Sequence, residues 1–418
     1  MNTQNFSAKN FAFLTRRGDY QEYFNDNQGK DNEVIKKGVL RDVENNLDVK
    51  NYAFQPLHSF NINKRRIYSL PRILKDNSNR FSIISDDYIL RKINQNLRKI
   101  YKVKQGDRFQ IISSVKTLLA NPAPFYVCQL DIKSFYENID RQKILTNIES
   151  SAMVSYQTKI LLKKFFSNPS ILNELPEKGL PRGINISATL AEYCMKNFDK
   201  KVSGIEWFYY YARFVDDIII FSTREITNQV IEEITRHLPT GLEFNVAKKV
   251  ICDFSEDIDV CISYLGYEFK CSKSVNERKI STRIAKKKMN KIKGKIVSSF
   301  LSYKSCQDFK LLKDRLLFLT ASYPLKQRKF SNYKDAGFLH GGIFYNYPLI
   351  DDLSCLSELD MFLKGLLFSK SMRKRIGNIL TDIQRTELGK FSFLQGYERR
   401  IVRRFKLDRI DRITECWR

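Results

Sequence analysis

The stretch YARFVDDIIIF (residues 211–221) decides the fold. Its β-forming residues stand on both sides of a carboxylate pair, Asp216 and Asp217. The stretch therefore predicts a hairpin, with strands at 207–214 and 218–221, that carries the pair at its tip. An Asp-Asp pair is common in turns, so this fragment alone says little about chemistry.

A second block, LDIKSFY (residues 130–136), gives the pair a meaning. The β-rich run at 125–130 predicts a strand that ends on Asp131. A turn at 179–183 and helical apolar spacing over 187–199 lie between the two blocks. The order strand, helix, hairpin, helix, strand predicts an α+β fold, with helices covering a sheet and the carboxylates at one of its edges.

Carboxylates gathered at a sheet edge meet one chemical need. Phosphoryl transfer with two metal ions requires acidic side chains that bridge ions about 3.5–4 Å apart. The chain has only three histidines, and its eight cysteines are scattered without a CxxC pair, which argues against a zinc site. Carboxylates without nitrogen or sulfur ligands select hard ions, so we expect two Mg²⁺ (or Mn²⁺) ions.

Charge indicates the partner. Lys and Arg number 72 against 46 Asp and Glu, a formal net charge of +26, and 43% hydrophobic residues can still build cores. Nucleic acid is favoured because cationic side chains that displace counterions supply most non-specific affinity. A merely soluble basic protein and an anionic membrane surface are the alternatives. No secretory signal or long apolar run is present, so we expect a cytoplasmic protein with reduced thiols and no membrane partner.

Two basic segments lie toward the C-terminus. Apolar residues at 280, 284, 292, 296 and 300 predict an amphipathic helix, and the lysines between them predict contact with a duplex backbone or, alternatively, a solvated face. Residues 301–418 have a helical pattern, and the arginines of 399–412 are spaced to line one side of a helix.

Taken together, the two aspartate blocks resemble those of reverse transcriptases, with Phe214 in the usual Tyr-x-Asp-Asp box. The preceding YAR is similar to retron and group II intron relatives. Further boxes of the family follow in order: LPRGINIS (180–187), GLEFNVAK (241–248), YLGYEF (264–269), which resembles the primer grip, and then the basic helix in the place of the thumb. The resemblance covers roughly residues 60–300.

This resemblance implies a right-hand polymerase with fingers, a palm with an antiparallel sheet, and a helical thumb. The domains implied are an N-terminal region and fingers at 1–120, a palm at 121–275 with a fingers insertion at 139–186, a thumb at 276–330 and a C-terminal helical extension at 331–418.

The same resemblance assigns roles by position. Asp131 and Asp216 would be metal ligands, supported by Asp217 and the backbone of Ile132. The implied catalytic residues are Asp131, Asp216, Asp217 and Lys248; the nucleotide-binding residues are Arg72, Tyr136, Arg182 and Gly183; the primer- or template-binding residues are Phe214, Tyr264, Leu265, Gly266, Lys287 and Lys291.

Some of these roles have alternatives. Tyr136 stands where the family keeps an aromatic ring that excludes a 2′ hydroxyl, and it could instead be a core aromatic. Lys248 could donate a proton to the departing pyrophosphate, neutralise its charge, or lie in a solvated turn. Arg182 replaces the usual Gln. The finger cations that could clamp the triphosphate are Lys64, Arg65, Arg66, Arg72, Arg80 and Arg108, with Arg72 the first choice.

The expected activity is RNA-directed DNA synthesis from deoxynucleotides. No RNase H block follows the thumb, and the run LDIKSFYENI (130–139) resembles bacterial defence-associated reverse transcriptases, including abortive-infection types and the smaller polymerase of type 3 two-polymerase systems. That placement implies a structured non-coding RNA, a DNA product, a second reverse transcriptase and a higher-order oligomer. The alternatives are an untemplated or protein-primed nucleotidyl extender, a catalytically silent RNA-binding scaffold and an RNA-copying RNA polymerase.

Overall fold

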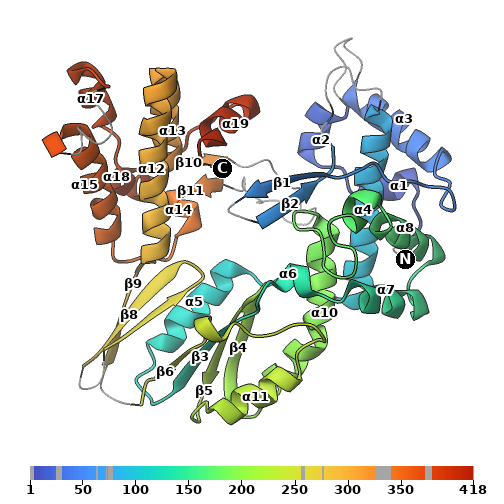
Figure 1. Cartoon of the computed structure of the whole chain (residues 1–418), viewed down its shortest axis with the longest axis horizontal. Coiled ribbons are helices and arrows are strands. Elements are labelled where there is room, and N and C mark those ends of the chain that lie inside the picture. The colour runs from blue at the N-terminus through green and yellow to red at the C-terminus, as the bar shows by residue number, and fades with distance from the viewer. Residues whose placement is uncertain are drawn as a thin grey trace. The chain divides into compact units, whose positions relative to one another are not determined.

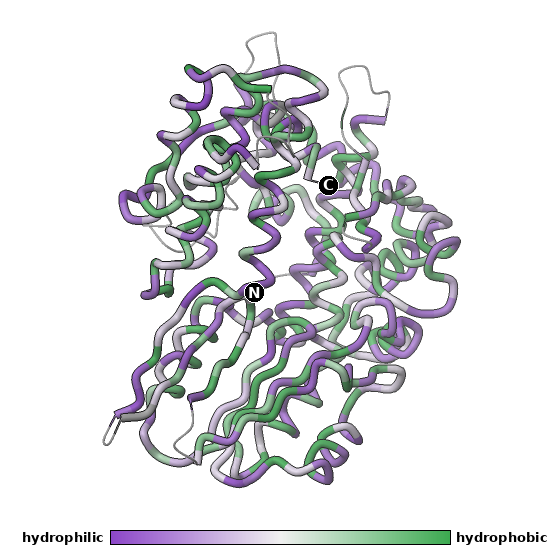
Figure 2. The backbone as a smooth tube through the Cα atoms, turned by 60° about the vertical axis from the view of Figure 1, so that its left-hand side comes forward, coloured by the Kyte–Doolittle hydropathy of each residue, from purple (hydrophilic) through white to green (hydrophobic). Residues whose placement is uncertain are grey.

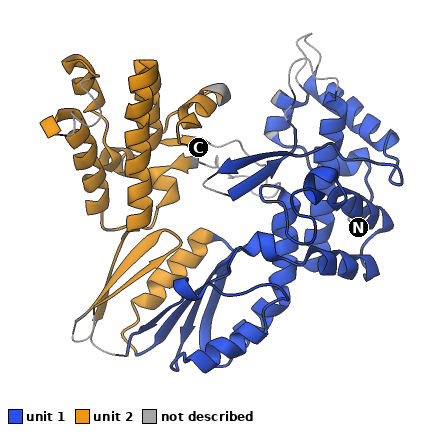
Figure 3. Cartoon of the chain, in the orientation of Figure 1, with its two compact units in different colours: residues 1–107, 124–256 blue, residues 108–123, 257–418 orange. Residues whose placement is uncertain are grey.

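The computed structural model describes residues 4–24, 31–62, 65–71, 73, 79–255, 259–274, 277–324, 340–371 and 379–417. These residues form two compact units (Figure 3): unit 1 covers 1–107 and 124–256, and unit 2 covers 108–123 and 257–418. Antiparallel strands and many helices confirm the α+β class predicted from the sequence.

Unit 1 is formed by the first part of the chain apart from one helix. Its elements (Figure 1) are α1 (Ala8–Ala12), α2 (Arg17–Glu22), α3 (Asn32–Asn45), β1 (His58–Ile62), β2 (Arg65–Ser69), α4 (Arg80–Tyr101), β3 (Tyr126–Asp131), α6 (Phe135–Asn138), α7 (Arg141–Ser150), α8 (Tyr156–Phe166), α9 (Pro169–Leu172), α10 (Asn185–Ser203), β4 (Phe208–Phe214), β5 (Asp217–Ser222), α11 (Asn228–Arg236), the 3-10 helix η1 (Val246–Lys248) and β6 (Val250–Asp253).

The centre of unit 1 is a four-stranded antiparallel sheet in the order β4-β5-β3-β6. Residues Ile218–Phe221 of β5 are fully buried on both faces, as expected for a continuous β-branched and aromatic run in a central strand. Apolar residues run along these strands in Figure 2. Helix α10 packs against β4 and against α4, so the strand ends that carry the aspartates have a rigid support.

Unit 2 contains the remaining elements. They are α5 (Arg108–Leu119), β7 (Val260–Tyr264), β8 (Tyr267–Ser274), β9 (Glu277–Ile284), α12 (Lys286–Cys306), α13 (Phe309–Thr320), β10 (Ser322–Pro324), β11 (His340–Gly342), α14 (Ile343–Asn346), α15 (Ser354–Phe368), α17 (Asp382–Leu388), α18 (Phe393–Glu398) and α19 (Leu407–Glu415). Strands β7, β8 and β9 form an antiparallel sheet, α5 packs on β9, and α12 packs against α13 and α15.

The start of the basic helix was predicted wrongly. Ile280 and Ile284 lie in strand β9, and the helix begins only at Lys286. In β9 the buried side chains are those of Arg278, Thr282 and Ile284, with Ile280 half-buried, which is a period of two. Four residues is two strand repeats as well as about one helical turn, so the Ile280–Ile284 spacing fits both.

The arginine-rich stretch at 399–412 is not one helix, so that prediction is also wrong. Residues 399–406 lie between α18 and α19, and Arg400 has φ +48°. The chain there is extended because it bonds to Ser322, whose backbone N–H donates to the Ile401 carbonyl over 2.7 Å. On α19, Arg409 pairs with Asp314 at 2.6 Å and Arg412 with Asp308 at 3.2 Å.

The length and hydropathy of the helices decide whether any of them could span a membrane. In the described part of the chain, no helix is both long enough and apolar enough to cross a bilayer.

Candidate active site

Asp131 and Asp217 lie opposite each other at the end of the unit 1 sheet. Asp131 is the last residue of β3, Asp217 is the first residue of β5, and the two are register partners. Directly opposed residues of antiparallel strands have Cβ atoms about 4.5–5.5 Å apart on the same face. The fold therefore brings together two carboxylates that are 86 positions apart in the sequence.

Asp216 is fixed beside them by a tight turn. Phe214 and Asp217 are register partners, so Val215 and Asp216 form a two-residue hairpin turn. Val215 has φ +60°, the left-handed backbone that such hairpin turns require at their first central residue. The Asp216 carbonyl accepts a 3.0 Å bond from the N–H of Ile132. The turn is thus tied to the residue that follows Asp131.

A buried arginine holds this turn from behind. Arg213 donates to the Val215 carbonyl over 3.0 Å and pairs with Glu192 and Asp199 of α10, each at 2.7 Å. Burial alone would lower the pKa of Arg213, but the two carboxylates outweigh it and hold that pKa above its usual value. Arg213 stays charged and fixed. The sequence patterns did not reveal this clamp, because its partners lie 14 and 21 positions away on another element.

Lys248 reaches the carboxylate of Asp131. Its Nζ lies 2.8 Å from both Oδ1 and Oδ2, and its side chain is 52% exposed against 10% for Asp131. The approach of this segment depends on backbone bonds: the Asn245 N–H donates to the Asp131 carbonyl over 2.7 Å and the Lys133 N–H to the Glu243 carbonyl over 2.9 Å. Phe244 of this segment forms an isolated β-bridge with Ile132.

The donor set suits a hard divalent cation. Three aspartates lie at this end of the sheet, and the Lys248 ammonium lies on the nearly buried carboxylate of Asp131, where a cation would balance its charge. Among the residues that the structure describes, no three His, Cys, Asp or Glu side chains form a preformed metal cage. Mg²⁺ usually keeps several waters and takes one or two carboxylates plus substrate phosphates, so the residues fit ions held jointly with substrate.

Tyr136 and Arg182 form a wall beside the carboxylates. The Arg182 guanidinium lies 4.7 Å from the centre of the Tyr136 ring. Burial is the main cause that raises the pKa of the Tyr136 hydroxyl, and the charges of Glu192 and Asp216 add to it. The charge of Asp216 also contributes to a raised pKa of Arg182. Both side chains are therefore within electrostatic range of the Asp216 carboxylate.

Gly183 allows the hairpin β1–β2 to approach this wall. It has φ +97°, and a Cβ there would lie 2.4 Å from the Tyr68 carbonyl oxygen and 2.8 Å from Ile67 Cγ2. The Tyr68 N–H donates to the Arg182 carbonyl over 2.7 Å. The structure thus gives Gly183 a packing role next to its predicted nucleotide contact.

We expect Gly183→Ala to lower the free energy of unfolding by about 2 kcal/mol or more, because the new methyl group adds a backbone clash to an unfavourable φ. Thermal or denaturant unfolding measures this. The matched control is Gly38→Ala in α3, where a Cβ meets nothing within 4 Å, and we expect a stabilisation of about 0.5–1 kcal/mol there. Equal effects of the two substitutions would contradict the packing role of Gly183.

The finger cations have different environments. Arg72 and Lys64 lie outside the described residues. In unit 1, Arg65 is exposed, Arg66 pairs with Glu174 at 3.2 Å, and Arg80 donates to the Tyr23 carbonyl over 2.9 Å.

The predicted primer-binding residues of unit 2 surround the β7–β8 turn. Leu265 and Gly266 have φ +45° and +87°, and Tyr264 is buried. Arg108, once a candidate for the triphosphate, donates to the Leu265 carbonyl over 3.1 and 2.7 Å. Its guanidinium thus shapes this turn. On α12, Lys287 and Lys291 are exposed and four positions apart.

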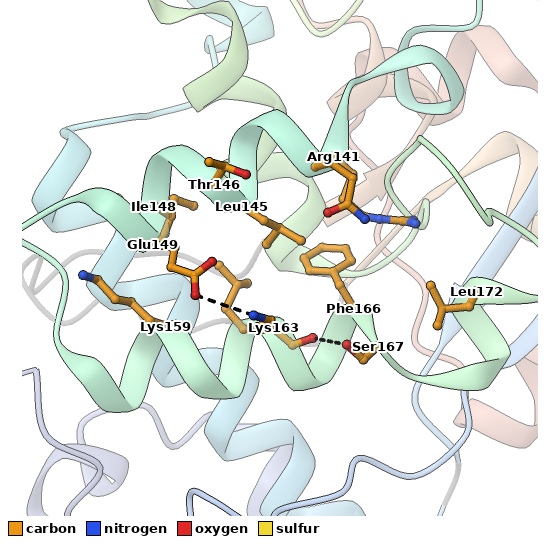
Figure 4. Close-up of a pocket in the computed structure, with 12 residues that line it drawn as sticks. Arg141, Leu145, Thr146, Ile148, Glu149, Lys159, Lys163, Phe166, Ser167 and Leu172 are labelled. Atoms are coloured by element: carbon orange, nitrogen blue, oxygen red, sulfur yellow. Dashed lines mark hydrogen bonds and ion pairs between the residues drawn. The ribbon is translucent and has the colours of Figure 1, made fainter.

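A separate cavity of about 320 Å³ lies between α7 and α8 (Figure 4). Its lining includes Arg141, Leu145 and Phe166 and none of the three aspartates. Arg141 is 1% exposed and donates to the carbonyls of Gly179, Leu175 and Pro176. The buried guanidinium is thus explained by its support of the turn before Leu180.

A comparison with protein families identifies the domain that holds this site. Residues 73–269 match the family described as reverse transcriptase (RNA-dependent DNA polymerase). The chain contains a reverse transcriptase domain. All three aspartates, Tyr136, Arg182 and Lys248 lie within the matched residues. No curated protein matches this chain.

Three solved structures similar to this chain are telomerases. Apo telomerase from Candida tropicalis, truncated from its C-terminal domain, is 12% identical over 56% of this chain and 56% of its own, with a TM-score of 0.37. Telomerase from Candida albicans with the TWJ fragment of telomeric RNA is 11% identical over 88% of this chain and 62% of its own, with a TM-score of 0.38. The Candida tropicalis telomerase with the TWJ fragment is 13% identical over 88% of this chain and 61% of its own, with a TM-score of 0.36. The chain spans 56–62% of the length of these telomerases.

Proposed function

We propose that this reverse transcriptase copies an RNA template into DNA by two-metal nucleotidyl transfer. The observation that carries the proposal is the register pairing of Asp131 with Asp217 at the sheet edge, with the Asp216 turn bonded to Ile132. In this assignment the fingers are 1–120 with the insertion 139–186, the palm is 121–275, the thumb is 276–330 and a helical extension follows at 331–418.

The residues at this sheet edge have the following proposed roles. Asp131 and Asp216 would hold two Mg²⁺ (or Mn²⁺) ions, with Asp217 and the Ile132 backbone in support. Bound ions of this kind activate the primer 3′ hydroxyl and balance charge on the triphosphate. Lys248 lies on the Asp131 carboxylate and can turn toward the leaving pyrophosphate, since its side chain is half-exposed. Tyr136, beneath the sugar, would exclude a 2′ hydroxyl, with Arg182, Gly183 and Arg72 lining the nucleotide site.

The template and primer would bind to cationic surfaces. Lys287 and Lys291 share one face of α12, and Gly294, one turn further along that face, leaves open space for a phosphate backbone. The primer- or template-binding residues would be Phe214 in unit 1 and, in unit 2, Tyr264, Leu265 and Gly266 of the β7–β8 turn. With a net charge of +26, binding should weaken steeply with salt.

For biological context we propose cytoplasmic antiviral defence in a bacterium. The RNA would be a structured non-coding RNA, and a second reverse transcriptase would join the chain in a higher-order oligomer. The support for this placement is the sequence run LDIKSFYENI (130–139).

Sequencing the product tests the activity. The protein is purified with its bound nucleic acid, supplied with deoxynucleotides and Mg²⁺, and assayed before and after ribonuclease treatment. We expect a DNA complementary to the co-purified RNA, and no product once that RNA is digested. A product that persists without RNA would favour an untemplated extender, and a product covalently attached to the chain would favour protein priming. Intact biological activity in an Asp216→Asn/Asp217→Asn variant would favour an RNA-binding scaffold.

A further inference from the structure

Glu137 and Arg182 form an ion pair next to the proposed sugar site. Arg182 Nε lies 2.6 Å from Glu137 Oε1, and Arg182 Nη2 lies 2.9 Å from Oε2. Both oxygens of the carboxylate are engaged, so the pair is bidentate. A bidentate Arg–carboxylate pair fixes the plane of the guanidinium as well as its distance.

The guanidinium held by Glu137 lies over the Tyr136 ring. The guanidinium is 4.7 Å from the ring centre, and Phe135 meets the same ring edge-on with centroids 5.5 Å apart. Tyr136 and Glu137 are neighbours on the short helix α6, which begins directly after Ser134, a residue with φ +46°. Glu137, Arg182 and Tyr136 thus form a chain of contacts, in which the carboxylate binds the guanidinium and the guanidinium lies over the ring.

Burial makes this pair different from an ordinary surface contact. The Arg182 side chain is 15% exposed and that of Glu137 is 43% exposed. Burial alone would lower the pKa of Arg182, yet the hydrogen bonds and charge of Glu137 raise it overall. The same contact lowers the pKa of Glu137 against the effect of its own burial. Each partner therefore stabilises the charged form of the other.

An arginine at this position could bind the triphosphate directly. Its pairing with Glu137 argues otherwise, because the Nε–Nη2 edge is already used and the charge of the guanidinium is balanced. A stiff, neutralised guanidinium–carboxylate unit is suited to hold a ring in place, whereas a triphosphate ligand needs uncompensated positive charge.

We propose that Glu137 is a positioning residue for sugar selection: it holds the Arg182 guanidinium over Tyr136 and so fixes the ring that excludes the 2′ hydroxyl. This inference rests on the proposed function, in which Tyr136 lies beneath the sugar of the incoming nucleotide. It adds a residue that does not touch the nucleotide and explains why arginine can occupy the position of the usual Gln.

Glu137→Gln is the main test, measured as kcat/KM for a deoxynucleotide and for the matching ribonucleotide on the same RNA template. The preference for the deoxynucleotide should fall about tenfold, through gain of ribonucleotide use, while the deoxynucleotide KM stays within about twofold. Arg182→Lys keeps the charge but loses the planar fork, so it should give the same loss of preference. The double variant should be no worse than either single one, because both act through one contact.

The matched control is Glu149→Gln. Glu149 pairs with Lys163 at 3.5 Å on the surface of α7 and α8, and its loss should leave the preference unchanged. Thermal unfolding of every variant is measured alongside, and if Glu137→Gln does not fold, Arg182→Lys carries the test.

The opposite pattern would overturn the inference. If Arg182 binds the triphosphate, Glu137→Gln frees it and lowers the KM of both nucleotides with an unchanged preference, while Arg182→Lys has little effect. Tyr136→Ala separates this inference from the proposed function. If that variant keeps the wild-type preference, the placement of Tyr136 beneath the sugar fails; if it loses the preference while Glu137→Gln keeps it, only the role of Glu137 fails.

Discussion

Asp131→Asn and Asp216→Asn should each reduce DNA synthesis by at least about a thousandfold. The amide keeps the shape of the side chain and removes the charge that would hold a divalent ion. A thousandfold loss corresponds to about 4 kcal/mol of transition-state stabilisation, which is in the range expected when a metal ligand is lost from a two-ion site. The measurement is single-turnover extension of a primer on an RNA template at saturating Mg²⁺.

Asp253→Asn is the control for both substitutions. Asp253 lies on β6 of the same sheet, opposite Tyr126 at the other end of β3 from Asp131. Its removal should change extension by less than about twofold. Binding of Mn²⁺ with nucleotide, followed by electron paramagnetic resonance, should weaken in the two active-site variants and not in the control. Wild-type extension by Asp131→Asn would contradict the two-metal assignment.

Lys248→Gln should have two effects of opposite sign. Extension should slow by about a hundredfold if the ammonium assists the leaving pyrophosphate, the range usual for a positioned proton donor. Mn²⁺ binding without nucleotide should tighten several-fold, because the ammonium that now lies 2.8 Å from both oxygens of Asp131 no longer competes with the ion. Rapid-quench kinetics measures the rate of extension, and titration calorimetry measures the affinity for Mn²⁺.

The neighbouring lysine provides the matched control. Lys249 Nζ lies 2.9 Å from Asn228 Oδ1, away from the carboxylates, so Lys249→Gln should leave extension and Mn²⁺ binding unchanged. If Lys248→Gln changed neither quantity, Lys248 would be a lysine of a solvated turn.

The sequence predicted the sheet edge well because local rules decide it. The hairpin around Asp216 and the strand ending on Asp131 are each set by β-forming residues next to a turn, and their register pairing followed. The misplaced helix start at Ile280 had a local cause too, since the same spacing fits both kinds of element. The bonds that tie residues 401–403 to Ser322 come from a segment nearly 80 positions earlier.

The supporting contacts could not be predicted in this way. The partners of Arg213 lie on α10, and Glu137 stands 45 positions from Arg182. Charged residues at such separations have many possible partners, and only the packed elements select one. The sequence therefore predicted candidate residues for the chemistry and left open which residues keep them in place.

The backbone of Val215 has a practical consequence. A β-branched residue with positive φ costs about 1–3 kcal/mol, and the bonds to Arg213 and Ile132 hold it there. The strained backbone at Val215 thus lowers the stability of the fold, and in exchange the carboxylate of Asp216 is held at the sheet edge. A more heat-resistant variant should therefore keep this hairpin unchanged, because relaxing the strain at Val215 would release the carboxylate of Asp216. Stabilising substitutions should be sought elsewhere, for example in helix α3.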